Sequence, residues 1–162
     1  MLAIAPAETP GLPESVDPAV VNGTPMPSSP RKPAPAGFLT GYRIVVVDDD
    51  PHCADVQATV LQAFGARVRR AYSGLSALGA LEDGFRPQVF LIDVFMPDMD
   101  GCELARRIRE RADCRQAKFI AWSGWGDAAD RARTREAGFA YHLVKPLELQ
   151  ELLAALDPPQ GR

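Results

Sequence analysis

The chain contains 162 residues and carries a net charge of −3 near neutral pH, with 46% hydrophobic and 24% charged residues. This length suits one ordinary soluble domain with an extension, and the slightly acidic balance argues against a dedicated nucleic-acid binder, which is usually strongly basic. No apolar run is long enough to span a membrane, the first residues do not resemble a secretory signal, and the three cysteines lack CxxC spacing, so we expect a cytoplasmic protein with reduced thiols.

The N-terminal quarter of the chain differs in composition from the rest. Nine of the fifteen prolines fall within residues 1–41, which hold few aromatic residues and no periodic apolar pattern. Such a segment cannot bury enough apolar surface to offset the entropy lost on ordering. We therefore predict a disordered, proline-rich arm over residues 1–41, a folded domain over 42–157 and a short tail over 158–162. The PxxP spacings in the arm leave a docking role open beside that of a solubilising linker.

From Tyr42 onward, short apolar strands alternate with amphipathic helices. Residues 43–47 form a β-branched run that is typical of a strand buried on both faces. Asp50 is expected to cap a helix that starts at Pro51 and stops at Gly65. The apolar face of this helix would consist of Val56, Val60, Leu61 and Phe64.

The same alternation continues to the end of the chain. Further strands are predicted at residues 67–72, 88–92, 118–122 and 140–144. Helices are predicted from Ser73 to Gly84, around Leu104 and Ile108, over 127–137 with few apolar residues, and after Pro146 with Leu149, Leu152, Leu153 and Leu156 at helical spacing. Five strands alternating with five helices predict an α/β fold, a parallel sheet covered by helices on both faces.

Polar residues follow these strands directly. They are Asp48 and Asp49, Tyr72, Asp93, Ser123 and Lys145. In open parallel sheets, ligands bind at the carboxyl ends of the strands, so we expect these side chains to share one crevice. Three carboxylates held together repel one another unless a cation joins them, and carboxylate oxygens suit a hard divalent ion, above all Mg²⁺. A hydroxyl and an ammonium beside that ion could hold phosphoryl oxygens.

Four sequence motifs carry a resemblance to a known family. They are VVVDDDP (45–51), FLIDVFMPDMDG (90–101), IAWSGWG (120–126) and AGFAYHLVKPL (137–147). In this order and spacing they resemble the response-regulator receiver domain of two-component signalling, from about Tyr42 to Asp157. The resemblance implies a flavodoxin-like, doubly wound five-stranded parallel sheet of order 2-1-3-4-5 with five helices.

The resemblance also implies roles for the acidic residues. Asp93 resembles the phosphoacceptor, whose carboxylate attacks the phosphorus of a phosphohistidine. Asp48 and Asp49 resemble the acidic pair that holds Mg²⁺, Asp49 directly and Asp48 more often through water. Asp93 and the backbone carbonyl of Phe95 would complete the protein's share of the metal ligands.

The remaining implied site residues lie near the ends of the last two strands. Ser123 resembles the hydroxyl that hydrogen-bonds the phosphoryl group, and Lys145 resembles the ammonium that pairs with it. The peptide bond between Lys145 and Pro146 would then be cis. The signalling position three residues before the lysine is usually Tyr or Phe, but here it is His142.

His142 makes the switching mechanism an open question. Imidazole is smaller than a phenyl ring, polar, and titrates near neutrality. A semi-exposed histidine without a switching role is therefore an alternative to a switch residue acting with Ser123. The form HLVKP resembles receivers that are attached to, or cooperate with, hybrid histidine kinases.

Several other residues have simpler interpretations. Asp50 is interpreted as a helix cap, and Asp98 and Asp100 as turn formers beside a glycine. The arginines at 106, 107, 109, 111 and 115 are interpreted as a solvated helix face, with an acidic partner as the alternative. Phe95 and Trp125 occupy positions that, in the family, flank the path of the hydrolytic water. Because both side chains are large, we hypothesise that they slow loss of the phosphoryl group.

These observations predict a response regulator receiver, with only self-catalysed phosphotransfer and dephosphorylation as its chemistry. Its donor would be a histidine kinase, a hybrid kinase or a phosphotransfer protein, and it would signal to an unknown downstream protein, as a single-domain regulator or a phosphorelay intermediate. The residues after the last helix leave no room for a DNA-binding or catalytic output domain, so we expect no direct nucleic-acid or membrane partner. Homodimerisation stays open.

Two other classes of protein compete with this prediction. An aspartate-nucleophile phosphatase would need a second acidic residue at position 95, where this chain has phenylalanine. A phosphorylation-independent interaction module (a pseudo-receiver) tends to lose the acidic pair, the hydroxyl and the lysine, all of which this chain retains.

Overall fold

The computed structural model describes residues 20–21, 24–25, 37–146 and 148–156. Most of the predicted arm (1–41) and the whole predicted tail (158–162) lie outside these residues. Within the arm, β1 (Val20–Val21) and β2 (Thr24–Pro25) form a short antiparallel pair. In the described ranges, no helix combines the length and apolar character needed to cross a membrane.

Five parallel strands form the central sheet in the order β4-β3-β5-β6-β7. Counted along the chain within this sheet, the order is 2-1-3-4-5, so the predicted topology is confirmed. The strands are β3 (Arg43–Val47), β4 (Arg67–Ala71), β5 (Val89–Asp93), β6 (Lys118–Ser123) and β7 (Tyr141–Val144). The helices are α1 (Pro51–Ala63), α2 (Gly74–Gly79), α3 (Gly101–Glu110), α4 (Ala128–Glu136) and α5 (Leu149–Leu156), with a 3₁₀ turn η1 (Ala112–Cys114).

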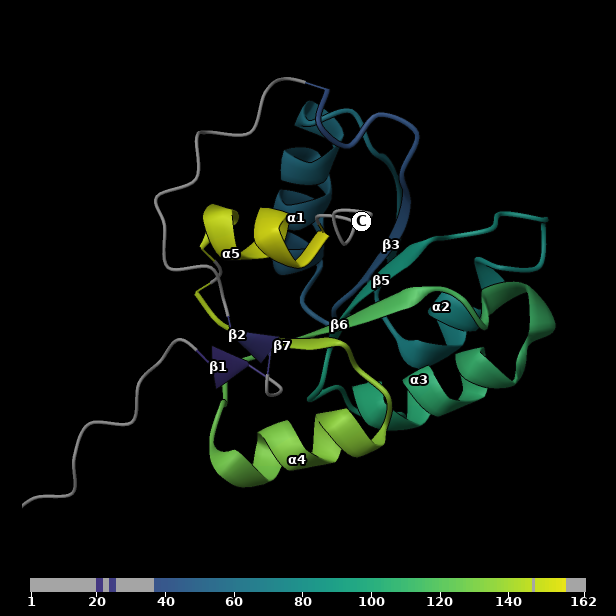
Figure 1. Cartoon of the computed structure of the whole chain (residues 1–162). Coiled ribbons are helices and arrows are strands. Elements are labelled where there is room, and N and C mark those ends of the chain that lie inside the picture. The colour runs from purple at the N-terminus through teal and green to yellow at the C-terminus, as the bar shows by residue number, and fades with distance from the viewer. Residues whose placement is uncertain (1–19, 22–23, 26–36, 147, 157–162) are drawn as a thin grey trace, which may run out of the picture.

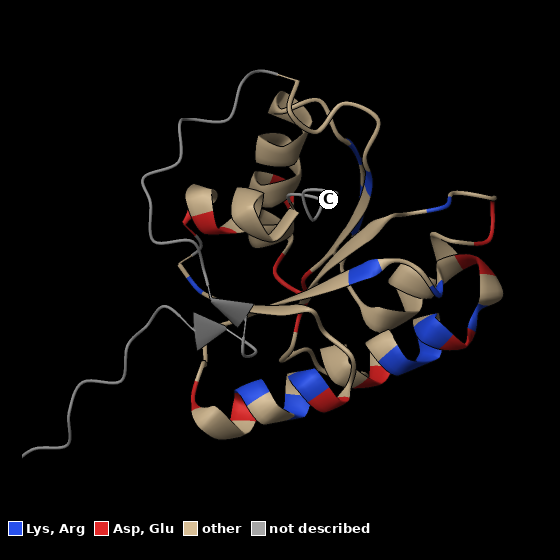
Figure 2. Cartoon of the chain, in the orientation of Figure 1, with Lys and Arg blue, Asp and Glu red and all other residues tan. Residues whose placement is uncertain are grey.

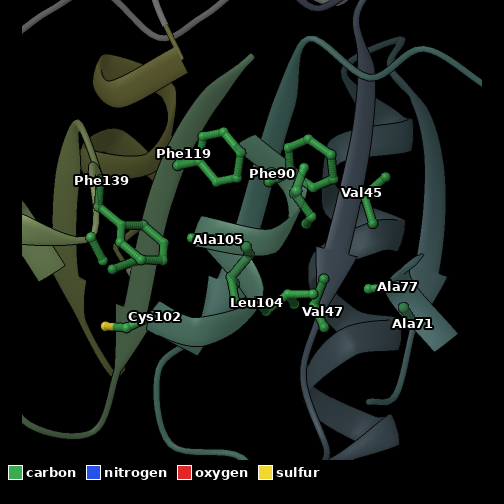
Figure 3. Packing of buried hydrophobic residues seen from close by; sticks show 14 of the residues in the cluster. Val45, Val47, Ala71, Ala77, Phe90, Cys102, Leu104, Ala105, Phe119 and Phe139 are labelled. Atoms are coloured by element: carbon green, nitrogen blue, oxygen red, sulfur yellow. The ribbon is translucent and has the colours of Figure 1, made fainter. Parts of the chain in front are cut away.

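Helices cover both faces of the sheet, with α1 and α5 on one side and α2, α3 and α4 on the other (Figure 1). Because successive strand residues point to opposite faces, Val45 and Val47 pack toward α2 and α3 while Ile44 and Val46 pack toward α1 and α5. On the face covered by α2 and α3, the rings of Phe90 and Phe119 stack with their centroids 5.0 Å apart (Figure 3). These two cores fix the ends of the central strands.

Packing of the domain begins before Tyr42. Residues 37–41 form a turn in which Leu39 is fully buried. The Leu39 amide donates a hydrogen bond to the carbonyl of Phe64, 2.9 Å away, at the end of α1. Phe38 and Leu39, which the sequence pattern assigned to the arm, therefore belong to the packed structure.

Two helices differ from their predicted form. The buried face of α1 consists of Ala54, Ala58 and Leu61, whereas Val56 is 44% exposed. The second helix, α2, ends at Gly79 and not at Gly84, and Leu75 is 70% exposed.

The predicted pattern is confirmed for α4 and only in part for α5, where Leu149 is 38% exposed. Thr134 is the buried residue of α4, which agrees with the few apolar residues predicted there. In α5, Leu152, Leu153 and Leu156 are buried against the sheet.

Candidate functional site

Three carboxylates meet where β3 and β5 end. Each of Asp48, Asp49 and Asp93 places an oxygen within 4.8 Å of an oxygen of the other two. Because β3 and β5 are adjacent strands on either side of the point where the strand order reverses, these residues lie at the position where such sheets bind ligands. Asp48 and Asp93 are buried and Asp49 is exposed, so the cluster opens to solvent on one side.

Lys145 reaches this cluster from the end of β7. Its Nζ donates hydrogen bonds to Oδ2 of Asp48 at 2.9 Å and to Oδ2 of Asp93 at 2.8 Å. The Lys145–Pro146 peptide bond is cis. Three strands therefore contribute side chains to one charged pocket, although β7 lies at the far edge of the sheet.

Acidic groups outnumber basic groups in this pocket. Burial raises the pKa of Asp48, and its hydrogen bond from Lys145 offsets this only in part. Burial alone would lower the pKa of Lys145, but the hydrogen bonds to Asp93 and Asp48 outweigh that effect and raise it. Three carboxyl groups therefore face a single amine, so the formal charge of the cluster is negative. Hard oxygen donors with this charge fit a divalent ion such as Mg²⁺.

Backbone amides fix the other oxygen of both buried carboxylates. Oδ1 of Asp48 accepts a hydrogen bond from the amide of Asp50 at 2.9 Å. Oδ1 of Asp93 accepts one from the amide of Phe95 at 3.0 Å. Each carboxylate is therefore oriented by an amide two residues along the chain, a local turn that aspartate favours.

Ser123 ends β6 on the same edge of the sheet. It is fully buried, and its Oγ accepts a hydrogen bond from the amide of Trp125 at 3.1 Å. Its carbonyl accepts one from the amide of Lys145 at 2.7 Å. Tyr72, the remaining strand-end residue, bonds through its hydroxyl to Asp55 on α1 and not to the acidic cluster.

His142 lies inside the protein at only 1% exposure, so the semi-exposed interpretation is wrong. Its Nε2 lies 2.9 Å from the carbonyl of Trp125, and its Nδ1 lies 3.0 Å from Oγ1 of Thr134. Since a carbonyl only accepts, Nε2 carries a proton. Oγ1 of Thr134 also lies 3.2 Å from the carbonyl of Asp130 and 3.1 Å from that of Arg131, so Nδ1 competes with these two acceptors for its single hydrogen. Burial lowers the pKa of His142, which favours the neutral ring.

Sequence reasoning missed two side chains around these residues. The ring of Trp122, on β6, lies 4.5 Å from Nζ of Lys145 and forms a cation–π contact. Thr134, on α4, anchors His142. The sequence around Trp122 and Thr134 gives no signal of either contact, because each contact depends on how elements that are distant in the chain pack together.

The two bulky residues near the site reach solvent. Phe95 is 43% exposed and Trp125 is 68% exposed. The guanidinium of Arg133, on α4, lies 5.8 Å from the centre of the Phe95 ring.

Comparison with known proteins identifies the family. The sequence-family model of the response regulator receiver domain matches residues 44–157 of this chain. This chain belongs to that family. Receiver domains are signalling domains, and the acidic cluster of this one lies at the carboxyl ends of its strands.

Relatives of this receiver domain include short proteins and longer regulators. Protein PilG of Pseudomonas aeruginosa is 28% identical over 116 residues, which are 72% of this chain and 85% of PilG. An uncharacterised 14.6 kDa protein of Leptolyngbya boryana is 37% identical over 115 residues, 71% of this chain and 87% of its own length. The response regulator MprA of Mycobacterium avium is 32% identical, but the match covers 49% of its length.

Solved structures show the same fold as this receiver domain. The chemotaxis response regulator CheY4 of Vibrio cholerae is 26% identical with a TM-score of 0.66, over 72% of this chain and 97% of that one. A response regulator described as putative, from Chloroflexus aurantiacus, is 32% identical with a TM-score of 0.66, over 71% and 93% of the two chains.

Proposed function

We propose that this receiver domain accepts a phosphoryl group on Asp93 from a histidine kinase, a hybrid kinase or a phosphotransfer protein. The observation that supports this most directly is the pair of hydrogen bonds from Lys145 to Asp48 and Asp93, beside the exposed carboxylate of Asp49. These residues lie where the parallel strands end, which is the position at which such sheets bind ligands.

The chain's own residues have distinct parts in the transfer. One oxygen of Asp93 attacks phosphorus, the phosphorus–nitrogen bond of the donor phosphohistidine breaks, and the departing imidazole keeps the electron pair. Lys145 and Ser123 then hold phosphoryl oxygens. Asp48, Asp49, Asp93 and the Phe95 carbonyl would hold Mg²⁺, which when bound neutralises charge on the transferred group.

The proposed output is a change of surface. A phosphoryl group adds charge and strong acceptors at Asp93. Nζ of Lys145 uses two of its three hydrogens in the bonds to Asp48 and Asp93, so the third can be donated to a phosphoryl oxygen. The domain would act as a single-domain regulator or as an intermediate in a phosphorelay, with the active surface selected from a pre-existing minor population.

Incubation of the full chain with acetyl phosphate and Mg²⁺ tests the proposal. The expected result is a stable mass gain of one phosphoryl group, mapped to Asp93 and absent in Asp93→Asn. Continuous turnover of acetyl phosphate without a stable adduct would indicate a phosphatase instead. No reaction in a protein that is folded by circular dichroism would indicate a pseudo-receiver.

A further inference from the structure

A second charged hollow lies at the opposite end of the sheet from Asp93. Its volume is about 400 Å³, within the range of small-molecule sites. Arg43 and Arg67, which line it, are the first residues of β3 and β4 and are paired in register. Since Asp48 and Asp93 lie where β3 and β5 end, the two pockets occupy opposite poles of the domain. The residues lining the hollow are Arg43, Arg67, Arg69, Asp83, Gly84, Phe85 and Arg86.

The lining carries four arginines and a single acid. That acid, Asp83, is already engaged, because both its oxygens lie 2.6 Å from guanidinium nitrogens of Arg69. Arg86 pairs with Asp113, which does not line the hollow, at 3.2 Å. These two ion pairs leave the positive charge of the other two arginines without a carboxylate in the hollow.

Arg43 and Arg67 carry this excess charge. Nε of Arg43 donates to the backbone carbonyl of Arg86 at 2.5 Å, an acceptor without formal charge. The exposed side chain of Arg67 makes no ion pair with any residue in the described part of the chain. The hollow is therefore lined by two guanidinium groups that no carboxylate of the lining balances.

The geometry points to a site for a small molecule that carries a diphosphate or longer phosphate chain, with Arg43 and Arg67 as its principal contacts. Guanidinium forks match phosphate oxygens in geometry and charge. The ring of Phe85, whose centre lies 4.3 Å from the Arg69 guanidinium, forms an apolar wall of the hollow. A long nucleic acid is the less favoured occupant because the whole chain is acidic, with a net charge of −3.

Calorimetric titration of the full chain with inorganic pyrophosphate, ADP and adenosine, in EDTA at low ionic strength, tests this site. Pyrophosphate and ADP are expected to bind and adenosine is not. Arg43→Gln and Arg67→Gln should each weaken binding about tenfold, the loss of one charged hydrogen-bonding group. ADP binding more tightly than pyrophosphate would identify a nucleotide as the ligand class, and equal affinity would identify the phosphate groups alone.

Two control variants test whether binding is specific to the hollow. Arg135→Gln removes the same charge from an exposed position on α4 and should leave the affinity unchanged, as should Asp93→Asn at the other pole. NMR shift changes on titration should centre on residues 83–86 and on the starts of β3 and β4. Absence of binding to the folded wild type, equal weakening by Arg135→Gln, or shift changes centred on Asp93 would each overturn the proposal, whatever the outcome for phosphorylation.

Discussion

Of the three clustered carboxylates, only that of Asp49 is exposed. Asp49→Asn should relieve repulsion within the cluster and raise the free energy of unfolding by about 1 kcal/mol in EDTA. The same variant should lose the stabilisation that Mg²⁺ gives the wild type by binding the native state. Urea unfolding with and without MgCl₂ measures both effects. Asp98→Asn, the same charge change at an exposed residue outside the cluster, should show neither effect, and equal behaviour of the two variants would contradict the metal assignment.

Phe95 and Trp125 offer apolar surface beside Asp93 and Ser123, since both side chains are substantially exposed. If they restrict the approach of water, Phe95→Asn and Trp125→Ala should both shorten the lifetime of the phosphorylated protein. Timed mass spectrometry after removal of the phosphodonor measures the decay. Unchanged decay in both variants would show that their bulk does not protect the phosphoryl group.

The contact between α3 and β5 depends on Gly101. A Cβ at this position would lie 2.3 Å from the carbonyl oxygen of Asp93 and 2.9 Å from Cα of Val94. Gly101→Ala must therefore push α3 away from the phosphoacceptor strand, and we expect it to lower the free energy of unfolding by about 1–3 kcal/mol.

Gly79→Ala is the matched control, because a Cβ at Gly79, the last residue of α2, meets nothing within 4 Å. Chemical denaturation of both variants checks the prediction. A Gly101→Ala protein as stable as Gly79→Ala would mean that α3 approaches β5 less closely than described.

His142 ties β7 to α4 and to the loop after β6. Burial lowers its pKa in the folded state, so protons bind the unfolded chain more readily. The stability contribution of the neutral ring is complete above the unfolded pKa, about 6.5, and is lost as pH falls below it toward the folded pKa. Between pH 7.5 and 5.5 the loss should reach at most about 1.4 kcal/mol.

Urea unfolding at the two pH values measures this loss, and His142→Gln should abolish it. Exposed His52 provides the control, since His52→Gln should keep the wild-type pH dependence. A pH dependence that survives His142→Gln would assign the effect to other groups, of which Asp127, Asp130 and Arg131 act on the ring electrostatically.

For the whole molecule, Leu39 sets where the packed domain begins. Its side chain is fully buried with Leu61 and Leu156 in the cluster beneath α1 and α5. We expect a chain starting at residue 37 to unfold with the free energy of the full protein, and a chain starting at residue 42 to lose about 2–5 kcal/mol, as for deletion of a buried leucine. Thermal and urea unfolding of the two truncations compare them, and equal stabilities would place the boundary at Tyr42.

The sequence could predict a parallel α/β sheet and the acidic cluster because both follow from short-range patterns, whereas the strand order 2-1-3-4-5 is implied only by the resemblance to the receiver family. Runs such as 43–47 identify strands, and a parallel sheet brings the residues after β3, β5 and β7 to one edge without further information. Helix caps are equally local, and Asp50 caps α1 as predicted. Asp100, interpreted from the sequence as a turn former, caps α3 by accepting amide hydrogen bonds.

Contacts between distant elements could not be predicted in this way. Asp100, interpreted as a turn former, also pairs with Arg133 on α4 at 2.8 Å. Basic and acidic residues alternate along α3 and α4 (Figure 2), as expected for a solvated face, but the Arg109 guanidinium lies 4.3 Å from the centre of the Phe119 ring. Such contacts depend on how helices rotate and approach one another, which periodicity does not specify.

The last residue of β6 and the loop that follows it are bonded to β7 and to the residue directly after β7. The Lys145 amide bonds the Ser123 carbonyl, and the His142 ring bonds the Trp125 carbonyl. Any displacement of this loop toward a modified Asp93 must stretch or break a tether to β7, so loop and edge strand have to shift in concert. Substitutions at position 142 would then tune the threshold for that coordinated motion without touching the reacting atoms.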